Sequence, residues 1–303
     1  MKIKKISYAL GSKKNLIKNI ARKNFKKIIN STGISKTYEV SKNEDIISLA
    51  IKASKKVITN DKKIDGIILI TQTPKYHIPP NSFIIQKQLG IKTNCIVFDL
   101  NHGCSGYIYG LKVANGLFKS KNINKILLIT TDNYSRYSKN LNVKLLFSDC
   151  ATATLLTKSN YNPKFDFFSN GTKYSSLSQE FNNYTKTIDD NSLNMNGNEV
   201  FNFSITEVPK LVTNFIKKNN LKLKDIDYML LHQASHIVND NIKRNINIED
   251  NKFLFNYNSF GNTVSSSIPL LIAKNFKKLR NKKAILCGFG VGLSVATCFY
   301  EFK

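Results

Sequence analysis

Residues 95–110 read Cys95-Ile-Val-Phe-Asp-Leu-Asn-His-Gly-Cys104-Ser-Gly-Tyr-Ile-Tyr-Gly110, a stretch that predicts a buried strand, a tight turn and the start of a helix. The run Cys95–Leu100 is typical of a buried strand, and the glycines on both sides of Cys104 favour a turn. Unpaired N–H groups and the helix dipole would lower the pKa of a thiol placed there. We therefore interpret Cys104 as a nucleophile; the alternative is a buried structural cysteine, normally the commoner role.

Outward from this stretch, predicted strands alternate with predicted helices in both directions. In the first half, residues 1–157, we expect strands at Ile3–Leu10, Gly66–Thr71, Cys95–Leu100, Lys125–Thr131 and Ala151–Thr157, and helices at Asp45–Ile58, Asn81–Leu89 and Ser105–Phe118. In the second half, residues 158–303, we expect strands at Asp227–Leu231, Lys252–Phe255, Lys283–Gly288 and Leu293–Glu301, and helices at Val200–Lys218, His236–Asn245 and Val264–Leu279. This alternation predicts an α/β protein whose sheets are covered on both faces.

The two halves also end alike. Lys125–Ile129 leads to Ala151–Thr154, and Lys283–Leu286 leads to Ser294–Thr297 with a similar pattern. We take this as a hypothesis of internal duplication. Between the halves, Ser169–Asn198 is rich in Asn, Ser, Thr and Gly, which predicts a long surface excursion of a kind that is often functional.

Three more segments suggest chemistry. His232 follows a predicted strand, where α/β proteins place reactive groups, although a core or capping histidine is the alternative. Asn262 precedes a predicted helix, so an N-cap role competes with a catalytic one. Gly288–Gly292 is either a plain hairpin turn or a source of backbone N–H groups for an oxyanion. With Cys104, these segments form a Cys–His–Asn set.

Composition narrows the class of protein. The 303 residues are 42% hydrophobic, and their formal net charge is +26. We interpret most of this charge as residue-usage drift, because the lysines are scattered; an acidic partner is the alternative. The five cysteines are odd in number and lack CxxC spacing, which argues against disulfides or zinc and favours the cytoplasm. No export signal or membrane span is predicted.

The order of these motifs resembles the β-ketoacyl-acyl-carrier-protein synthase III family over almost the whole chain. The matching segments are Gly103–Gly106, His232–Ala234, Gly261–Thr263 and Gly288–Gly292, with Thr32–Ile34, Gln86–Ile91 and Met195–Phe201 in support. The resemblance implies the duplicated five-layered α-β-α-β-α thiolase fold, assembled as a homodimer.

The same resemblance implies the roles of individual residues. Cys104 would accept an acyl group from a thioester, and His232 and Asn262 would serve the decarboxylation of a malonyl thioester. The resulting carbanion would attack the acyl group in a Claisen condensation. Backbone N–H groups of Cys104 and Val291 would form the oxyanion hole. No metal or redox cofactor is implied.

The resemblance further implies substrate contacts and partners. Substrate-binding positions would be Ile78, Gly261, Gly290 and Gly292, with Ile78 as the gate residue that reaches across the dimer. The partners would be an acyl carrier protein and acyl thioesters, including acyl-coenzyme A. We expect neither nucleic acid nor a membrane as a partner.

Some positions depart from the family pattern. The family's coenzyme A clamp of Trp and Arg falls near Lys27 and Ser31 here, and the chain has no Trp. The family's carrier-docking Arg falls at about Ile237. The catalytic motifs are thus retained while starter recognition is changed. This leaves two interpretations: initiation of fatty-acid synthesis, or a specialised acyltransferase for secondary metabolites or surface glycans.

Other functions remain as alternatives. A 3-hydroxy-3-methylglutaryl-CoA synthase would need a glutamate acid, for which Glu199 is the candidate, and a thiolase would need a second cysteine, for which Cys287 is the candidate. A papain-like hydrolase also combines Cys, His and Asn but lacks support here. A basic nucleic-acid-binding protein would account for the charge alone.

Overall fold

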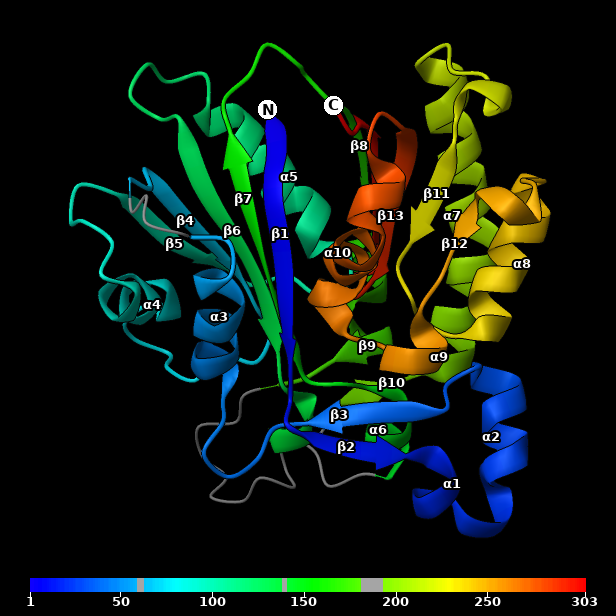
Figure 1. Cartoon of the computed structure of the whole chain (residues 1–303). Helices are drawn as coiled ribbons and strands as arrows, with labels where there is room; N and C mark the ends of the chain where they lie inside the picture. Colours follow the sequence, from blue (N-terminus) through cyan, green and yellow to red (C-terminus); the bar gives the residue numbers. More distant parts are fainter. Residues whose placement is uncertain (59–62, 138–140, 181–192) are drawn as a thin grey trace.

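Two five-stranded sheets with the same strand order form the framework of the molecule (Figure 1). The computed structural model describes residues 1–58, 63–137, 141–180 and 193–303. The first sheet has the order β1 (Lys2–Leu10), β7 (Cys150–Thr157), β6 (Lys125–Asp132), β4 (Gly66–Ile70) and β5 (Ile96–Leu100). The second has the order β8 (Lys164–Ser169), β14 (Ser294–Glu301), β13 (Lys283–Gly290), β11 (Tyr228–Leu231) and β12 (Phe253–Leu254).

The pairing directions also agree between the sheets. β1, β7 and β6 pair antiparallel, as do β8, β14 and β13, and the remaining pairs in each sheet are parallel. Strand β6 therefore corresponds to β13, and β7 corresponds to β14. These are the segments whose sequences look alike, so the architecture confirms the duplication hypothesis.

Helices cover both faces of each sheet. Helices α5 (Gly106–Leu117) and α10 (Ser267–Leu279) lie between the sheets, and one continuous apolar core joins them to both inner faces. Helices α3 (Ile46–Lys55) and α4 (Asn81–Leu89) cover the outer face of the first sheet. Helices α7 (Gly197–Lys218) and α8 (His236–Ile246) cover the outer face of the second. The result is the predicted α-β-α-β-α thiolase fold (Figure 1).

Helix α5 is buried over most of its surface because it lies between the two sheets. Its residues Tyr107, Ile108 and Leu111 are fully buried, and the Tyr107 hydroxyl bonds to Thr154 of β7 at 3.3 Å. A Cβ at Gly110 would lie 2.6 Å from a Leu128 methyl, so only glycine lets the helix approach the sheet this closely. This close packing fixes the position of the residues just before α5.

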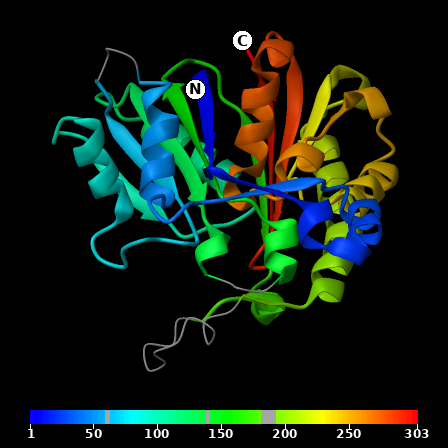
Figure 2. The same ribbon diagram turned by 60° about the horizontal axis from the view of Figure 1, so that its bottom comes forward.

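The largest part of the fold that was not predicted is near the N-terminus. Residues 11–44 form β2 (Lys13–Leu16), α1 (Ile17–Ile20), the turn η1 (Arg22–Asn24), α2 (Phe25–Thr32) and β3 (Lys36–Glu39). This N-terminal arm runs beneath both halves (Figure 2). Contacts hold it to each: Thr37 Oγ1 donates to the Lys144 carbonyl of the first half, and the Ser35 N–H donates to the Asn258 carbonyl of the second.

The remaining elements are short. They are η2 (Tyr134–Arg136), α6 (Leu141–Leu146), η3 (Gly171–Ser176), β9 (Leu177–Ser178), β10 (Asn194–Met195), η5 (Leu223–Asp225), η6 (Asp250–Lys252), α9 (Tyr257–Phe260) and η7 (Val264–Ser266). The predicted excursion Ser169–Asn198 contains η3, β9 and β10, and its residues 181–192 lie outside the described part. Among the described helices, none combines the length and apolarity needed to cross a bilayer.

Candidate active site

The three residues of the predicted Cys–His–Asn set line one cavity of about 300 Å³, which we call the His232 cavity. Cys104 lies between β5 and α5, His232 directly follows β11, and Asn262 lies between α9 and η7. Each side chain thus comes from a different loop, and two come from the second half. All three residues are largely buried, with exposed fractions of 9%, 2% and 5% in that order.

The Cys104 sulfur lies beside two backbone donors. The backbone N–H groups of Cys104 itself and of Val291 lie near it, and both act to lower the pKa of the thiol. They are the two N–H groups that the family resemblance assigned to an oxyanion hole. Donors that converge on the sulfur are also close to any carbonyl oxygen attached to it, so the geometry suits the stabilisation of a developing oxyanion.

Two glycines of β13 make this approach possible. A Cβ at Gly288 would lie 2.6 Å from Cα of Ser105, and a Cβ at Gly290 would lie 3.2 Å from the Cys104 sulfur. Gly290 also has a φ of +146°, a value that residues other than glycine rarely adopt. The glycine-rich segment therefore packs directly against the thiol.

The predicted pKa of Cys104 is wrong in direction. The turn and helix start are present, with α5 beginning at Gly106, but burial raises the pKa of the thiol to about 12, and the neighbouring Asp132 carboxyl acts in the same direction. The two backbone N–H groups lower the pKa by less. Sequence alone showed the helix terminus but not the depth of burial, so the resting residue is a thiol rather than a thiolate.

His232 is held rigidly in its neutral form. The backbone N–H of His232 donates to the Cys287 carbonyl at 2.8 Å, and its backbone carbonyl accepts from Asn239 Nδ2 at 3.1 Å. Phe289 packs edge-on against the imidazole ring. Burial lowers the pKa of the imidazole to about 3. Its Nδ1 atom is buried with no hydrogen-bond partner among the described residues. A neutral imidazole can either accept or donate a proton in the cavity.

Asn262 is not the N-cap of the turn that follows, because Thr263 takes that position. Its Oδ1 accepts the N–H of Val264 at 2.9 Å, which makes an Asx turn just before η7. Because the oxygen is engaged in this way, Nδ2 is the polar group left for the cavity, and Nδ2 is a donor. Bonds from Asn262 N–H to the Leu146 carbonyl and from Ser148 N–H to the Asn262 carbonyl fix the loop on the first half.

A second cavity of about 270 Å³ lies on another side of Cys104, and we call it the Tyr134 cavity. Besides Cys104 and Val291, its lining includes the aromatic pair Tyr134 and Phe147 and the polar side chain of Gln72. The Tyr134 hydroxyl donates to Gln72 Oε1 at 3.3 Å. Sequence analysis missed these residues. The available signal was that Gln72 follows the end of a parallel strand, as His232 does.

Asp132 is the other residue that sequence analysis missed. It ends β6 and is fully buried, and it accepts the Gln72 N–H at 2.8 Å, the Ser265 N–H at 3.3 Å and the Ser265 hydroxyl. Burial raises its pKa to about 7. Through Ser265 it ties the segment just after Asn262 to the first half.

The other predicted substrate positions are distributed differently. Gly290 lines the His232 cavity with Cys104. Gly261 has a φ of +63°, and a Cβ there would lie 2.9 Å from Ser148 Oγ, so it serves the close approach of two loops. Gly292 is in the turn before β14, with a φ of +128°. Ile78 is 80% exposed in the single chain.

The residues of two alternative functions are engaged elsewhere. Glu199 at the start of α7 bonds to Lys173 at 2.5 Å and to Ser176 at 2.6 Å. Cys287 lies fully buried within β13, where it accepts from the Thr297 hydroxyl. In the described part of the chain, neither residue lines the His232 cavity or the Tyr134 cavity.

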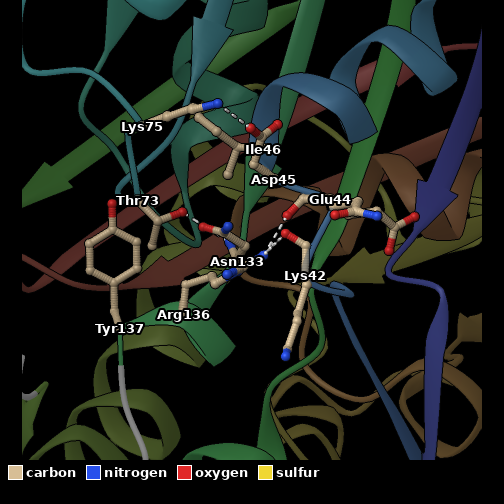
Figure 3. A pocket seen from close by; sticks show the side chains of 10 residues that line it. Lys42, Glu44, Asp45, Ile46, Thr73, Lys75, Asn133, Arg136 and Tyr137 are labelled. Atoms are coloured by element: carbon tan, nitrogen blue, oxygen red, sulfur yellow. Dashed lines mark hydrogen bonds and ion pairs between the residues drawn. The ribbon is translucent and has the colours of Figure 1, made fainter.

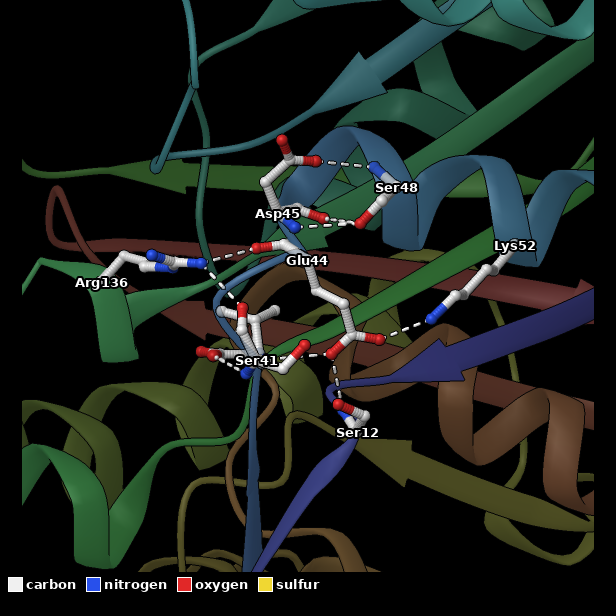
Figure 4. Close-up of polar contacts among 9 residues, drawn as sticks. Ser12, Ser41, Glu44, Asp45, Ser48, Lys52 and Arg136 are labelled. Atoms are coloured by element: carbon white, nitrogen blue, oxygen red, sulfur yellow. Dashed lines mark hydrogen bonds and ion pairs between the residues drawn. The ribbon is translucent and has the colours of Figure 1, made fainter.

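A larger cavity of about 620 Å³ lies apart from these groups, between the start of α3 and the end of β6 (Figure 3). Four of its charged side chains, those of Glu44, Asp45, Lys75 and Arg136, have partners within the protein. Lys75 bonds to Asp45 at 2.7 Å, and the Arg136 guanidinium donates to three backbone carbonyls of residues 41–44 (Figure 4). Glu44 bonds to Lys52 and to the N–H groups of Ser12 and Ser41. This network stabilises the loop before α3.

Comparison with known proteins agrees with the geometry. A family model described as 3-oxoacyl-[acyl-carrier-protein (ACP)] synthase III matches residues 98–173, and its C-terminal counterpart matches residues 216–302. The chain is 34% identical to beta-ketoacyl-[acyl-carrier-protein] synthase III of Clostridium botulinum, covering 84% of this chain and 83% of the relative. It is 32% identical to the Clostridium perfringens protein of that name, covering 96% of both.

Solved structures give the same answer. A 2.1 Å crystal structure of a 3-oxoacyl-(acyl-carrier-protein) synthase III superposes with a TM-score of 0.91 at 30% identity, covering 99% of both chains. The Thermus thermophilus enzyme, at 23% identity, shares the fold with a TM-score of 0.90.

Proposed function

Because the chain belongs to the 3-oxoacyl-[acyl-carrier-protein] synthase III family and is an acyl-transferring condensing enzyme, we propose that Cys104 accepts the starter acyl group and that His232 and Asn262 promote condensation. One observation supports this assignment above the others. A thiol, a neutral imidazole and an amide donor line one buried cavity, beside two backbone N–H groups that converge on the sulfur.

In the first step, the Cys104 sulfur attacks the carbonyl carbon of an acyl thioester. The carbonyl oxygen becomes an oxyanion held by the N–H groups of Cys104 and Val291. Since the resting thiol is neutral, its proton must leave during the attack, and neutral His232 is positioned in the same cavity to accept it. The C–S bond to the carrier then breaks, and the departing sulfur takes the proton from His232. Cys104 is left as a thioester.

In the second step, a malonyl thioester occupies the His232 cavity. His232 and Asn262 Nδ2 donate hydrogen bonds to its thioester carbonyl, which stabilises the enolate formed as CO₂ leaves. The enolate carbon attacks the acyl carbonyl on Cys104, a C–C bond forms, and the bond to the Cys104 sulfur breaks. The thiolate that is released takes up a proton from solvent, the one proton that the decarboxylative condensation consumes, and this restores the resting enzyme. These residues accomplish both steps without a metal or redox group.

Cys104 acylation is the direct test. The protein is incubated with a panel of acyl thioesters, and the adduct is measured by intact mass and located by peptide mapping. We expect one acyl group on Cys104 and none on a Cys104→Ala variant. An adduct of the same mass that persists in Cys104→Ala would overturn the assignment, and the panel also reports which chain length is preferred.

We further propose that the enzyme is a homodimer that pairs through the outer edge of β5, which has no partner strand in the described part of the chain. The Ile96 N–H bonds to the Asp65 carbonyl, and the Thr71 N–H bonds to the Leu100 carbonyl, so the backbone of Val97 and Asp99 faces away from β4. An unpaired apolar strand edge favours association. Exposed apolar side chains lie on β5 itself (Ile96), on the adjacent helix α4 (Phe83) and in the loop before α4 (Tyr76 and Ile78).

Two further proposals concern the cellular compartment and the carrier of the starter acyl group. All five cysteines are free thiols, which suits a reducing cytoplasm. The starter is proposed to arrive on an acyl carrier protein in preference to coenzyme A, because Lys27 and Ser31 stand where the family has its aromatic–arginine clamp. The second proposal is tested by loading Cys104 with the same acyl chain from acyl carrier protein and from coenzyme A. The specificity constants for the two donors are then compared. A higher constant with acyl-coenzyme A would contradict it.

A further inference from the structure

The rim of the His232 cavity is built from three elements. The end of α2 contributes Ser31 and Thr32, the region around the start of α7 contributes Met195, and the start of α8 contributes Ile237. Helix α2 packs on α8: a Cβ at Gly33, the C-cap of α2, would lie 2.7 Å from Cβ of His236. The N-terminal arm therefore forms one wall of the entrance to the site.

The arm is strongly one-sided in charge. Between residues 11 and 38 it contains eight basic residues and no acidic residue: Lys13, Lys14, Lys18, Arg22, Lys23, Lys26, Lys27 and Lys36. On and just before α2, the side chains of Lys23, Lys26 and Lys27 are exposed, and in the described part of the chain no carboxylate pairs with them. Their charges are directed at solvent: Lys27 lies one helical turn before Ser31, which lines the cavity, and Lys23 and Lys26 precede it on the same segment.

The other two rim elements do not offer free positive charge. At the start of α7, Glu199 forms an ion pair with Lys173 at 2.5 Å. On α8, Asp240 lies 3.2 Å from Lys243 and 2.6 Å from Arg244, and Asp250 lies 2.8 Å from Lys243, so two carboxylates compensate the two cations. The position that matches the family's docking arginine is Ile237, whose side chain is 46% exposed. The rim is thus basic on one side and apolar next to the opening.

We propose that the acidic acyl carrier protein docks on α2, with Lys23, Lys26 and Lys27 facing its carboxylates and with Ile237 and Met195 forming the apolar contact at the opening. An exposed apolar centre flanked by charge is the usual anatomy of a transient protein interface. Scattered lysines elsewhere would raise the encounter rate in general, whereas Lys23, Lys26 and Lys27 belong to the segment that ends at the opening through which the thioester must enter. This inference rests on the proposed function of Cys104.

The test compares two triple charge reversals that change net charge equally. The first variant is Lys23→Glu/Lys26→Glu/Lys27→Glu on α2. The control is Lys217→Glu/Lys222→Glu/Lys224→Glu, in the exposed segment before the start of β11. The site lies at the opposite end of β11, where His232 follows the strand. Figure 1 shows this segment and α2 at opposite ends of the second half. Each variant is loaded at Cys104 with one acyl chain on carrier protein, on coenzyme A and on N-acetylcysteamine.

The α2 variant should lose about tenfold or more in the specificity constant for acyl-carrier protein, and the loss should shrink as salt is raised. The control should lose much less. The N-acetylcysteamine thioester has no protein to dock, so its rate reports the cleft alone and should be similar in all three proteins.

Three results would overturn the docking site. Equal losses in both triple variants would assign the effect to overall charge. Unchanged loading of the α2 variant from carrier protein would remove α2 from the interface. An equally large loss with acyl-coenzyme A would assign the lysines to the nucleotide. Failure of the wild-type protein to load from N-acetylcysteamine thioester at Cys104 would instead contradict the proposed function itself, so the two failures are distinguishable.

Discussion

At the level of single residues, the chemistry depends on burial more than on local sequence. The helix start that favours a thiolate is present at Cys104, yet desolvation raises the pKa of the thiol to about 12 and lowers the pKa of His232 to about 3. Both groups are therefore neutral at rest. The identities of Cys104, His232 and Asn262 were accessible from sequence because each follows or precedes a predicted strand or helix. Their protonation states depend on surrounding atoms that no sequence pattern specifies.

A pH profile follows from Asp132. Its pKa is about 7, and its charge raises the pKa of Cys104, so ionisation of Asp132 opposes negative charge on the sulfur. Acyl loading should therefore fall as pH rises from about 6 to 8, by about tenfold if the coupling is worth one pKa unit. The measurement is the first-order loading rate across this range.

The matched variant for this profile is Asp132→Asn, which removes the titrating charge and should give a flat profile. The titratable groups that interact with Asp132 are Cys104, Tyr134, Tyr137, Asp149 and Cys150. A wild-type rate that instead climbs about tenfold per pH unit would show that the thiol loses its proton to solvent, and that His232 is not the acceptor.

Asn262 should separate the two half-reactions. Asn262→Ala removes the Nδ2 donor, which acts on the malonyl thioester but not on the starter. Loading of Cys104 should stay within a few-fold of wild type, while CO₂ release should fall about 10²–10³-fold, the usual effect of losing one such donor. Radiolabelled CO₂ release and intact mass report the two steps separately. Wild-type CO₂ release in the variant would remove Asn262 from the mechanism.

At the level of elements, two glycines of α5 give a matched pair. A Cβ at Gly110 would lie 2.6 Å from Leu128 Cδ1 and 2.7 Å from Ile70 Cδ1, while a Cβ at the exposed Gly116 would meet nothing within 4 Å. Gly110→Ala should lower the free energy of unfolding by about 1–3 kcal/mol through overpacking. Gly116→Ala should raise it by roughly 0.5–1 kcal/mol through helix propensity. Urea unfolding measures both, and equal effects would contradict the packing of α5.

The elements that sequence predicted are those with strong periodicity or long apolar runs. Strands such as β4 and β6 are buried over nearly their whole length, and their sequences reflect it. The N-terminal arm lacks this signal, because α2 has only eight residues and none of them is fully buried. β8 was missed for a similar reason: its residues are half-buried or exposed at the edge of the second sheet. Tertiary contacts, rather than local propensity, stabilise these parts.

At the level of the whole molecule, the outer edge of β5 predicts the oligomeric state. Sedimentation velocity should show the wild-type protein as a dimer at micromolar concentration. Phe83→Glu combined with Ile96→Glu places charge on the apolar patch beside β5 and should yield monomers. Phe255→Glu, a change at an exposed aromatic of the second half, should leave the dimer intact. A double variant that still sediments as a dimer would mean that subunits associate through another surface.

The two sheets have one further consequence. Cys104 lies between β5 and α5, and Asn262 lies between their counterparts β12 and α10. Gln72 follows β4, and His232 follows its counterpart β11. Each half of the chain thus presents the same two loops to the active-site cleft. A half-length chain paired with itself would have to present two cysteines or two asparagines across the cleft, because symmetry makes its copies identical. Covalent duplication breaks that symmetry, so a nucleophile on one side can oppose hydrogen-bond donors on the other.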